Sequence, residues 1–229
     1  FSNKVVTSFL EKSAENGIEI FRTFDALNDF NNIEFSIKEV KRIGKHAQGT
    51  IAYTTSPVHN LDTWLDLAKK IEDSGADSLA IKDMAGLLRP FDAYDLVKSL
   101  KESLSIPIHM QTHATTGMSP ATNMKAIEAG IDNIDTSISS LSMTYGHTAT
   151  ETMLAIFEGQ DRYLDLDLEA LEEVSTFFKD IREKYSEFEG NLKGVDSTML
   201  VKQVPGGMLS NLESQLRANK QEDKIDLVK

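Results

Sequence analysis

A single lysine, Lys82, lies near the end of an otherwise apolar stretch, SLAIKD, over residues 78–83. If this stretch is a β-strand, Ser78 and Ala80 share the lysine's face of the sheet. An unpaired ammonium group is costly to bury. Lys82 therefore reaches solvent, pairs with its neighbour Asp83, or is neutralised or modified within a site. The residues alone leave these alternatives open.

Two histidines, His109 and His113, are four residues apart in IPIHMQTHATTG, residues 106–117. Pro107 argues against a helix. On a strand about 13 Å would separate the two histidines, so one metal ion cannot bind both. Gln111 and His113 can share an ion, which leaves His109 as a core histidine or as support for a ligand. The alternative is that His113 is an ordinary hydrogen-bonded residue at a strand end.

The segment VPGGMLSNLESQL, residues 204–216, contains a third candidate group. Gly206 and Gly207 would let the backbone approach a bound molecule closely. The Ser210 hydroxyl can transfer a proton, or it can simply cap the helix that follows. In YGHTATET, residues 145–152, His147 has no partner that the sequence identifies.

Composition narrows the classes of function. The 229 residues have a formal net charge of −12 and no long basic run, which argues against nucleic acid as a partner. No cysteine is present, which excludes disulfides, thiolate metal sites and cysteine nucleophiles. No apolar stretch approaches the roughly 20 residues of a membrane span. The chain starts at Phe1 rather than Met, and we expect further chain upstream.

A repeat of about 30 residues, each a short apolar strand followed by an amphipathic helix ending in glycine, is typical of parallel α/β folds. In such folds the site lies at the carboxyl ends of the strands. The predicted strands are Ile18 to Phe24, Ala47 to Tyr53, Ser78 to Lys82, Ile108 to Thr112 and Asn133 to Ile138.

Helix signals separate these strands. Asn60 and Ser119 are the expected N-caps of two helices, and Gly75 is an expected helix end. From residue 165 the pattern changes to one longer helix with a stripe of apolar residues. We therefore predict a partial barrel over 1–164 and a helical addition over 165–229.

Six ordered stretches cover almost the whole chain: FRTFDALND, HAQGTIAYTTSPVH, IKDMAGLL, THATTGM, DTSISSLS and QVPGGMLSNLESQL. Together they resemble the carboxyltransferase domain of biotin-dependent enzymes that act on pyruvate and oxaloacetate, most of all the oxaloacetate decarboxylase alpha subunit. The resemblance implies a TIM (β/α)8 barrel with a helical funnel. The five predicted strands would be its fourth to eighth.

The resemblance also implies a divalent metal, commonly zinc, held by a first-strand aspartate, a carboxylated lysine and two histidines. Lys82 matches the lysine and His113 matches one histidine. Gln111 stands where the other histidine is expected, and the aspartate has no counterpart. Ser210 matches a catalytic threonine that moves a proton between biotin and pyruvate, with Gly206 and Gly207 beside this pocket.

The implied function is carboxyl transfer from oxaloacetate to biotin, giving pyruvate, with biotin on a carrier domain that this sequence does not contain. A membrane sodium-pump subunit or a biotin carboxylase subunit would be a further partner, and we expect a homo-oligomer. The expected location is cytoplasmic, next to the inner face of the membrane if the pump is the partner.

Three alternatives remain. The carboxyltransferase subunit of a pyruvate carboxylase would run the half-reaction in reverse, and an aldolase-like lyase or synthase would need no biotin. The third is a non-catalytic barrel, degenerate at Gln111, that serves as an assembly module.

Overall fold

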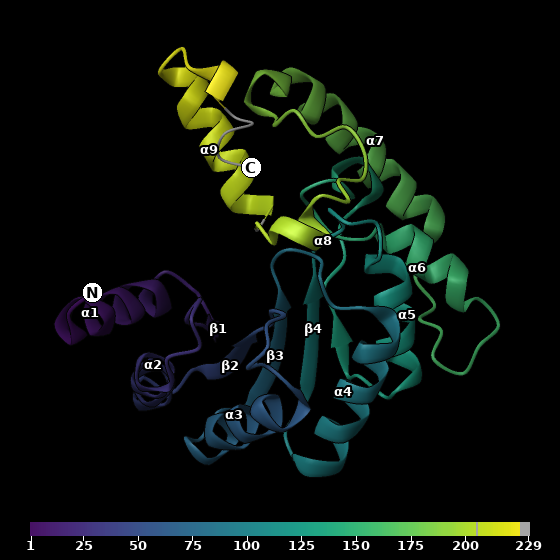
Figure 1. Cartoon of the computed structure of the whole chain (residues 1–229). Helices are drawn as coiled ribbons and strands as arrows, with labels where there is room; N and C mark the ends of the chain where they lie inside the picture. Colours follow the sequence, from purple (N-terminus) through teal and green to yellow (C-terminus); the bar gives the residue numbers. More distant parts are fainter. Residues whose placement is uncertain (205, 225–229) are drawn as a thin grey trace.

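The computed structural model describes residues 1–204 and 206–224 and is built on one parallel β-sheet (Figure 1). The five strands are adjacent in sequence order, so each helix crossover returns the chain to the next position in the sheet. The strands are β1 Ile20–Thr23, β2 His46–Ala52, β3 Ser78–Asp83, β4 Ile108–Thr112 and β5 Asn133–Ile134. This is the expected α/β fold, with its sheet open rather than closed into a barrel.

Helices follow the strands and continue into a C-terminal helical region (Figure 1). Helix α1 Asn3–Glu15 precedes β1, and the crossover helices are α2 Phe30–Arg42, α3 Leu61–Asp73, α4 Pro90–Ser103 and α5 Ser119–Glu128. Beyond β5 come η1 Ser139–Leu141, α6 Thr150–Phe157, α7 Leu168–Lys184, η2 Ser186–Phe188, α8 Met199–Lys202, α9 Gly206–Ala218 and η3 Glu222–Lys224.

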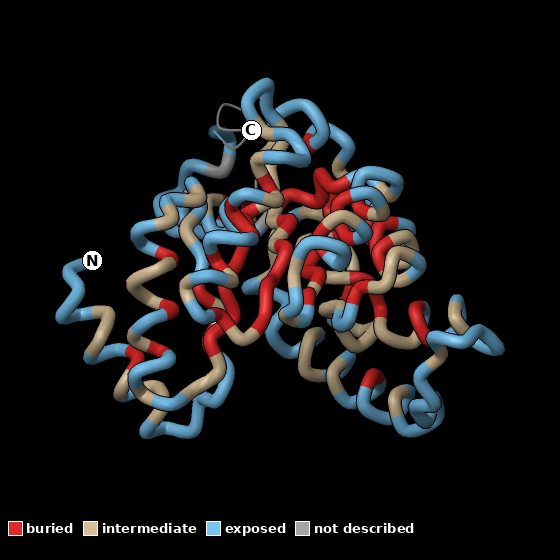
Figure 2. Tube along the Cα trace, turned by 90° about the horizontal axis from the view of Figure 1, so that it is seen from below, coloured by how far each residue is buried: buried red, intermediate tan, exposed pale blue. Residues whose placement is uncertain are grey.

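The two faces of the sheet differ in chemistry. Alternate residues such as Ile51, Ile81 and Met110 are fully buried against the helices and form the apolar core. The burial is concentrated along the strands and on the helix sides that face them (Figure 2). The opposite, concave face has polar side chains, among them Gln48 and His109. This polar face carries the candidate site.

Local signals explain some of the helix boundaries. The Asn60 side chain accepts a hydrogen bond from the Thr63 amide, as expected of an N-cap, and Gly75 ends the same region at φ +91°. The prediction for Ser119 is wrong: Met118 is the N-cap, and Ser119 is the first helical residue. Its buried hydroxyl instead contacts the Thr148 hydroxyl at 2.6 Å, so a tertiary contact replaces the cap.

The fifth strand is shorter than predicted. Regular pairing covers only Asn133 and Ile134, after which the Asp135 amide still donates to the Met110 carbonyl at 2.8 Å. Ser137 then forms an isolated bridge with Ala149 rather than a strand. The predicted extension to Ile138 is therefore wrong, because the chain leaves the sheet edge to enter η1.

The apolar stripe of α7 is only partly covered. Leu168 and Val174 are exposed, whereas Ser175 is buried and its hydroxyl lies 2.7 Å from that of Ser139 in η1. The division of the chain near residue 165 stays a prediction. Among the described helices, none is long and apolar enough to cross a membrane.

Candidate functional site

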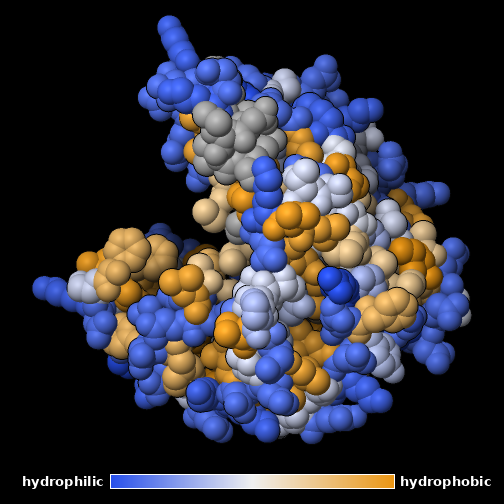
Figure 3. Space-filling view, viewed as in Figure 1, coloured by the Kyte–Doolittle hydropathy of each residue, from blue (hydrophilic) through white to orange (hydrophobic). Residues whose placement is uncertain are grey.

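A cavity of about 520 Å³ opens at the carboxyl ends of the first four strands. The space-filling view shows the surface hollowed between the N-terminal helices and α9 (Figure 3). The cavity includes residues from the β1–α2 loop, the end of β2, the end of β3, the turn after β4 and the start of α9. They are Ala26, Leu27, Asn28, Ala52, Tyr53, Thr54, His59, Lys82, Met84, Ala85, Leu87, His113, Gln203, Gly207 and Met208.

Asn28 fixes the loop that borders this cavity. Its amide group both donates to the Ala52 carbonyl at 2.9 Å and accepts from the Ala52 amide at 2.8 Å. The residue is in the left-handed region, at φ +57°, which asparagine tolerates. The loop thus continues the pairing of β2 beyond β1 and places Phe24 near the site.

Lys82 lies in the cavity wall, paired in register with Ala52 on one side and Gln111 on the other. Its ammonium nitrogen is 5.1 Å from the centre of the Phe24 ring. Burial, and secondarily the charge of Arg22, lower the pKa of Lys82 from its usual value. The side chain is therefore more easily neutralised than a surface lysine.

Asp83 is not the partner of Lys82. Its fully buried carboxylate accepts hydrogen bonds from the amides of Leu87 and Leu88 at 2.8 and 3.0 Å and from the Thr112 hydroxyl at 2.9 Å. Because adjacent strand residues point to opposite faces, Asp83 organises the following turn on the helix side. An ion pair with Asp83 is therefore excluded for Lys82.

Gln111 and His113 follow Lys82 around the concave face. Gln111 is 3 % exposed, and its Oε1 atom has no hydrogen-bond partner among the described residues. The His113 Nδ1 atom donates to the Tyr145 carbonyl at 2.6 Å, a tautomer that leaves Nε2 as an acceptor. Burial lowers the pKa of His113 to about 4, so the imidazole is neutral at physiological pH.

His109 belongs to a separate network. Its Nε2 atom lies 2.5 Å from Asp135 Oδ1, while the other oxygen of Asp135 accepts from Arg22 at 2.7 Å. Arg22 also donates to Gln48, on β2. The predicted separation of His109 from the pair Gln111 and His113 is consistent with these contacts.

The glycine-bearing segment meets the cavity at the start of α9. Gly207 contributes to the cavity wall, and the helix begins at Gly206. Ser210 is therefore inside the helix, where its hydroxyl donates to the Gly207 carbonyl at 3.1 Å. The interpretation of Ser210 as an N-cap is wrong because the helix begins four residues earlier. Its side chain lies one turn from the cavity wall.

Two further residues attach the C-terminal region to the site, and no local sequence signal identifies them. The Gln203 side chain donates to the Thr55 hydroxyl at 2.9 Å, across 148 positions of sequence. The Tyr145 hydroxyl donates to Glu213 at 3.1 Å, and burial together with Glu213 raises the pKa of this tyrosine to about 12. Tyr145 thus contacts both His113, through its carbonyl, and α9, through its side chain.

The donor chemistry fits a divalent ion only through a mixed set of ligands. Among the described residues, no group of three or more His, Cys, Asp or Glu side chains can hold a metal. Among the described residues, Gln111 Oε1 is nevertheless a buried acceptor without a hydrogen-bond partner. His113, two positions further along and on the same face, has an Nε2 atom that is available to a ligand. With Lys82 they could supply three donors.

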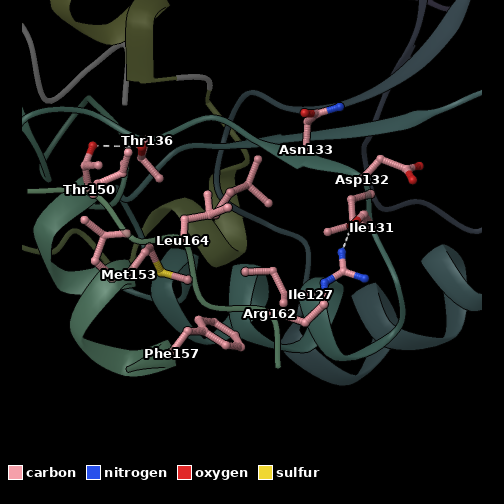
Figure 4. A pocket seen from close by; sticks show the side chains of 13 residues that line it. Ile127, Ile131, Asp132, Asn133, Thr136, Thr150, Met153, Phe157, Arg162 and Leu164 are labelled. Atoms are coloured by element: carbon pink, nitrogen blue, oxygen red, sulfur yellow. Dashed lines mark hydrogen bonds between the residues drawn. The ribbon is translucent and has the colours of Figure 1, made fainter. Parts of the chain in front are cut away.

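A second cavity, of about 280 Å³, lies beside β5 and between α5, α6 and the segment that follows α6 (Figure 4). Its walls are mainly apolar, with Met153, Phe157 and Leu164 among them. Arg162 at its rim donates to the Ile131 carbonyl, and the Thr136 and Thr150 hydroxyls bond one another at 2.8 Å. These polar groups are satisfied within the protein, so this cavity offers packing rather than chemistry.

The chain is similar to proteins that are named as carboxyltransferases and pyruvate carboxylases. It is 48 % identical over 230 residues to the methylmalonyl-CoA carboxyltransferase 5S subunit of Propionibacterium freudenreichii subsp. shermanii, covering 100 % of this chain and 45 % of that protein. It is 47 % identical to a pyruvate carboxylase subunit of Methanocaldococcus jannaschii, covering 100 % of this chain and 40 % of the relative. The chain thus spans less than half the length of these relatives.

Solved structures agree with the sequence relatives. The carboxyl transferase domain of Rhizobium etli pyruvate carboxylase with pyruvate superimposes with a TM-score of 0.93 at 33 % identity, covering 98 % of this chain and 39 % of that one. The expected resemblance to carboxyltransferase domains is confirmed. Residues 16–178, more than half of the sequence, match the HMGL-like family. The chain belongs to the HMGL-like family.

Proposed function

We propose that this chain supplies the carboxyl-transfer chemistry of a biotin-dependent enzyme, moving a carboxyl group between biotin and a 2-oxo acid of the pyruvate and oxaloacetate pair. The observation that carries the proposal is the cavity in which Lys82 and His113, from neighbouring strands, face Gly207 of α9. The relatives named above, a carboxyltransferase and pyruvate carboxylases, support the same chemistry.

Lys82, Gln111 and His113 would hold a divalent metal, for which zinc is our proposal. Such an ion would stabilise the negative charge that develops on the 2-oxo oxygen when the carboxyl group leaves. The lowered pKa of Lys82 favours the neutral amine that is needed to react with CO₂. In that step the neutral amine nitrogen forms a bond to the carbon of CO₂ and releases one proton to solvent, which would convert the neutral amine into an anionic carbamate ligand.

His113 contributes a fixed orientation. Its hydrogen bond to the Tyr145 carbonyl holds the ring, as is usual for histidines that bind metals through the other nitrogen. The pKa of about 4 means that protons do not compete for this nitrogen near neutral pH. His113 is thus a permanently available neutral donor.

Ser210 would move the proton. In the decarboxylation direction the bond between the carboxyl carbon and C3 of oxaloacetate breaks, and its electron pair remains on the pyruvate enolate. Biotin nitrogen takes the carboxyl group and gives up its proton, which the Ser210 hydroxyl relays to C3. Gly206 and Gly207 would let the biotin ring approach the start of α9. The reverse direction, carboxylation of pyruvate, uses the same groups.

Carboxybiotin must be delivered or consumed elsewhere. We propose a biotin carrier domain as the direct partner, with either a membrane sodium-pump subunit or a biotin carboxylase subunit acting on it. The relative from Methanocaldococcus jannaschii, a pyruvate carboxylase subunit, favours the second of these. Gln111 is the observation that favours a different function, a non-catalytic barrel, because glutamine is a weak neutral ligand for zinc.

The test is turnover by the purified protein with oxaloacetate and free biotin, with pyruvate measured as product. We expect biotin-dependent pyruvate formation and its loss in Lys82→Ala, with bound metal lost in the same variant. Pyruvate formation at the same rate with and without biotin would indicate an aldolase-like lyase. A correctly folded protein with neither turnover nor bound metal would support the non-catalytic barrel and overturn the proposal.

A further inference from the structure

We infer that His147 is a metal ligand of this site. With His113 it would supply two imidazole donors, whereas Gln111 and His113 would supply only one. This inference rests on the proposed function, because it assigns an additional donor to the same ion. Gln111 would then be a neighbour of the ion rather than an essential ligand.

The distance between the two rings is the first argument. The centres of the His113 and His147 rings are 5.0 Å apart, and the ring planes are inclined by 47°. In a tetrahedral zinc site with Zn–N bonds of about 2.1 Å, each ring centre lies roughly 3.2 Å from the metal, and two ligand rings are roughly 5 Å apart. The 5.0 Å separation of the ring centres therefore permits both imidazoles to bind one ion.

The anchoring of both rings is the second argument. His113 Nδ1 lies 2.6 Å from the Tyr145 carbonyl oxygen, and His147 Nδ1 lies 3.2 Å from the Thr112 carbonyl oxygen. A histidine that binds metal usually donates its other ring N–H to a carbonyl or carboxylate in this manner. Each residue therefore retains Nε2 for a ligand, and neither Nε2 has a hydrogen-bond partner among the described residues.

The loop that places His147 is the third argument. Met143 and Thr144 both have positive φ, at 61° and 51°, although neither is glycine. Gly146 is closely surrounded, since an added Cβ would lie 3.1 Å from the Leu141 carbonyl and 3.2 Å from that of Met143. Backbone strain of this kind persists where the surrounding structure imposes it, often at functional sites.

The same loop is joined to the candidate ligand turn. The Ala114 amide donates to the Gly146 carbonyl at 2.9 Å, and the Met143 amide donates to the His147 carbonyl at 2.7 Å. The first bond holds the two histidine-bearing segments side by side, and the second closes the loop that carries His147. Lys82 is paired in register with Gln111 on the neighbouring strand and lines the same cavity as His113.

The inference is tested by cobalt binding, which reports on the ligands without requiring turnover. The metal-free protein is titrated with Co²⁺, and both affinity and the visible d–d spectrum are recorded for His147→Ala, His113→Ala and Gln111→Ala. His46→Ala is the matched control, because His46 bonds to Ser78 at the beginning of its strand. Circular dichroism and thermal unfolding establish that each variant is folded.

We expect His147→Ala to weaken Co²⁺ binding at least about 100-fold, since losing even a group that supports a ligand costs about 10- to 100-fold. Its spectrum should change in the same way as that of His113→Ala. Gln111→Ala should weaken binding less than His147→Ala, and His46→Ala should not change it.

One outcome would overturn this inference and leave the proposed metal site intact. In it His147→Ala keeps wild-type cobalt affinity and spectrum, while His113→Ala and Gln111→Ala lose binding. Absence of Co²⁺ binding by the wild-type protein would overturn both. If His147→Ala unfolds, His147→Phe, which keeps a planar ring but no donor atom, replaces it, and wild-type cobalt affinity in that variant would equally overturn the inference.

Discussion

Arg22 and Asp135 form an ion pair of 2.7 Å that joins the first strand of the sheet to the end of the fifth, across its concave face. Three strands separate these two in the sheet order, so the pair requires strong curvature. His109 bonds to the other carboxylate oxygen of Asp135, and Gln48 accepts from Arg22. This polar layer lies deeper on the concave face than Lys82 and His113.

The first prediction concerns Asp135. Burial alone would raise its pKa, but the hydrogen bonds from His109 and Arg22 outweigh burial and hold the pKa well below its usual range. Asp135→Asn should lower the free energy of unfolding at pH 7 by about 2 kcal/mol, measured by urea denaturation. Glu34→Gln, which removes an exposed pair with Lys38, should cost less than about 0.5 kcal/mol.

The same pKa sets a pH dependence. Because the folded protein holds this proton less tightly than the unfolded chain, the contribution of Asp135 to stability is fully present above about pH 4. It is lost progressively as the pH falls below that value. The stability difference between wild type and Asp135→Asn should therefore narrow between pH 5 and strongly acidic solution, and a constant difference would contradict the role of the carboxylate.

The second prediction concerns Gly86, in the turn after β3. It has φ +66°, and an added Cβ would lie 2.6 Å from the His113 carbonyl oxygen. Gly86→Ala should lower the free energy of unfolding by about 3 kcal/mol, because a strained backbone is combined with a clash. It should also weaken metal binding by displacing His113.

A matched variant separates the two costs of this substitution. Gly44 has a similar φ of +72° but nothing within 4 Å of an added Cβ. Gly44→Ala should therefore show only the backbone cost, about 1 kcal/mol, and unchanged metal affinity. Equal destabilisation of the two variants would indicate that the contact with His113 carries no cost.

The third prediction concerns Tyr145, which contacts His113 through its carbonyl and Glu213 through its hydroxyl. Glu213 is 4 % exposed, so removing a donor leaves a buried carboxylate with one hydrogen bond fewer. Tyr145→Phe should raise hydrogen exchange and proteolysis in the region from Asn191 to α9 more than in the sheet. Tyr185→Phe, at an exposed ring, should leave both unchanged. Uniform loosening of the whole protein would contradict a local attachment.

The sequence predicts the local parts of this molecule well. The limits of β4 are as expected, and Lys82 and His113, at the ends of two predicted strands, line one cavity, because a parallel sheet brings its carboxyl ends together. The separation of His109 from Gln111 and His113 follows from strand geometry alone. These features depend on residues close together in the sequence.

The features that were missed or mistaken depend on distant residues. Ser119 carries a good N-cap signal, yet its hydroxyl is used by Thr148, which is 29 positions away. His147 has no local partner in the sequence, because its neighbour His113 is brought to it by the strained turn at Met143 and Thr144. Local propensity contains no information on such contacts.

The last prediction separates proton transfer from metal binding. Ser210 lies one turn into α9, and within the part of the chain that the structure describes its hydroxyl bonds only to the Gly207 carbonyl of its own helix. Ser210→Ala should therefore keep the helix and the bound metal while reducing biotin-dependent carboxyl transfer about 10²- to 10⁴-fold, the usual contribution of a positioned proton donor.

Ser210→Thr retains the hydroxyl and should recover most of the activity. Ser214→Ala, one turn further along the same helix, is the control for helix damage, since the Ser214 hydroxyl donates to the Ser210 carbonyl in the same way. Metal content and pyruvate formation are measured together in all three variants. Near-normal transfer by Ser210→Ala, with metal content unchanged, would remove the serine from the mechanism and assign proton transfer to another group in the cavity.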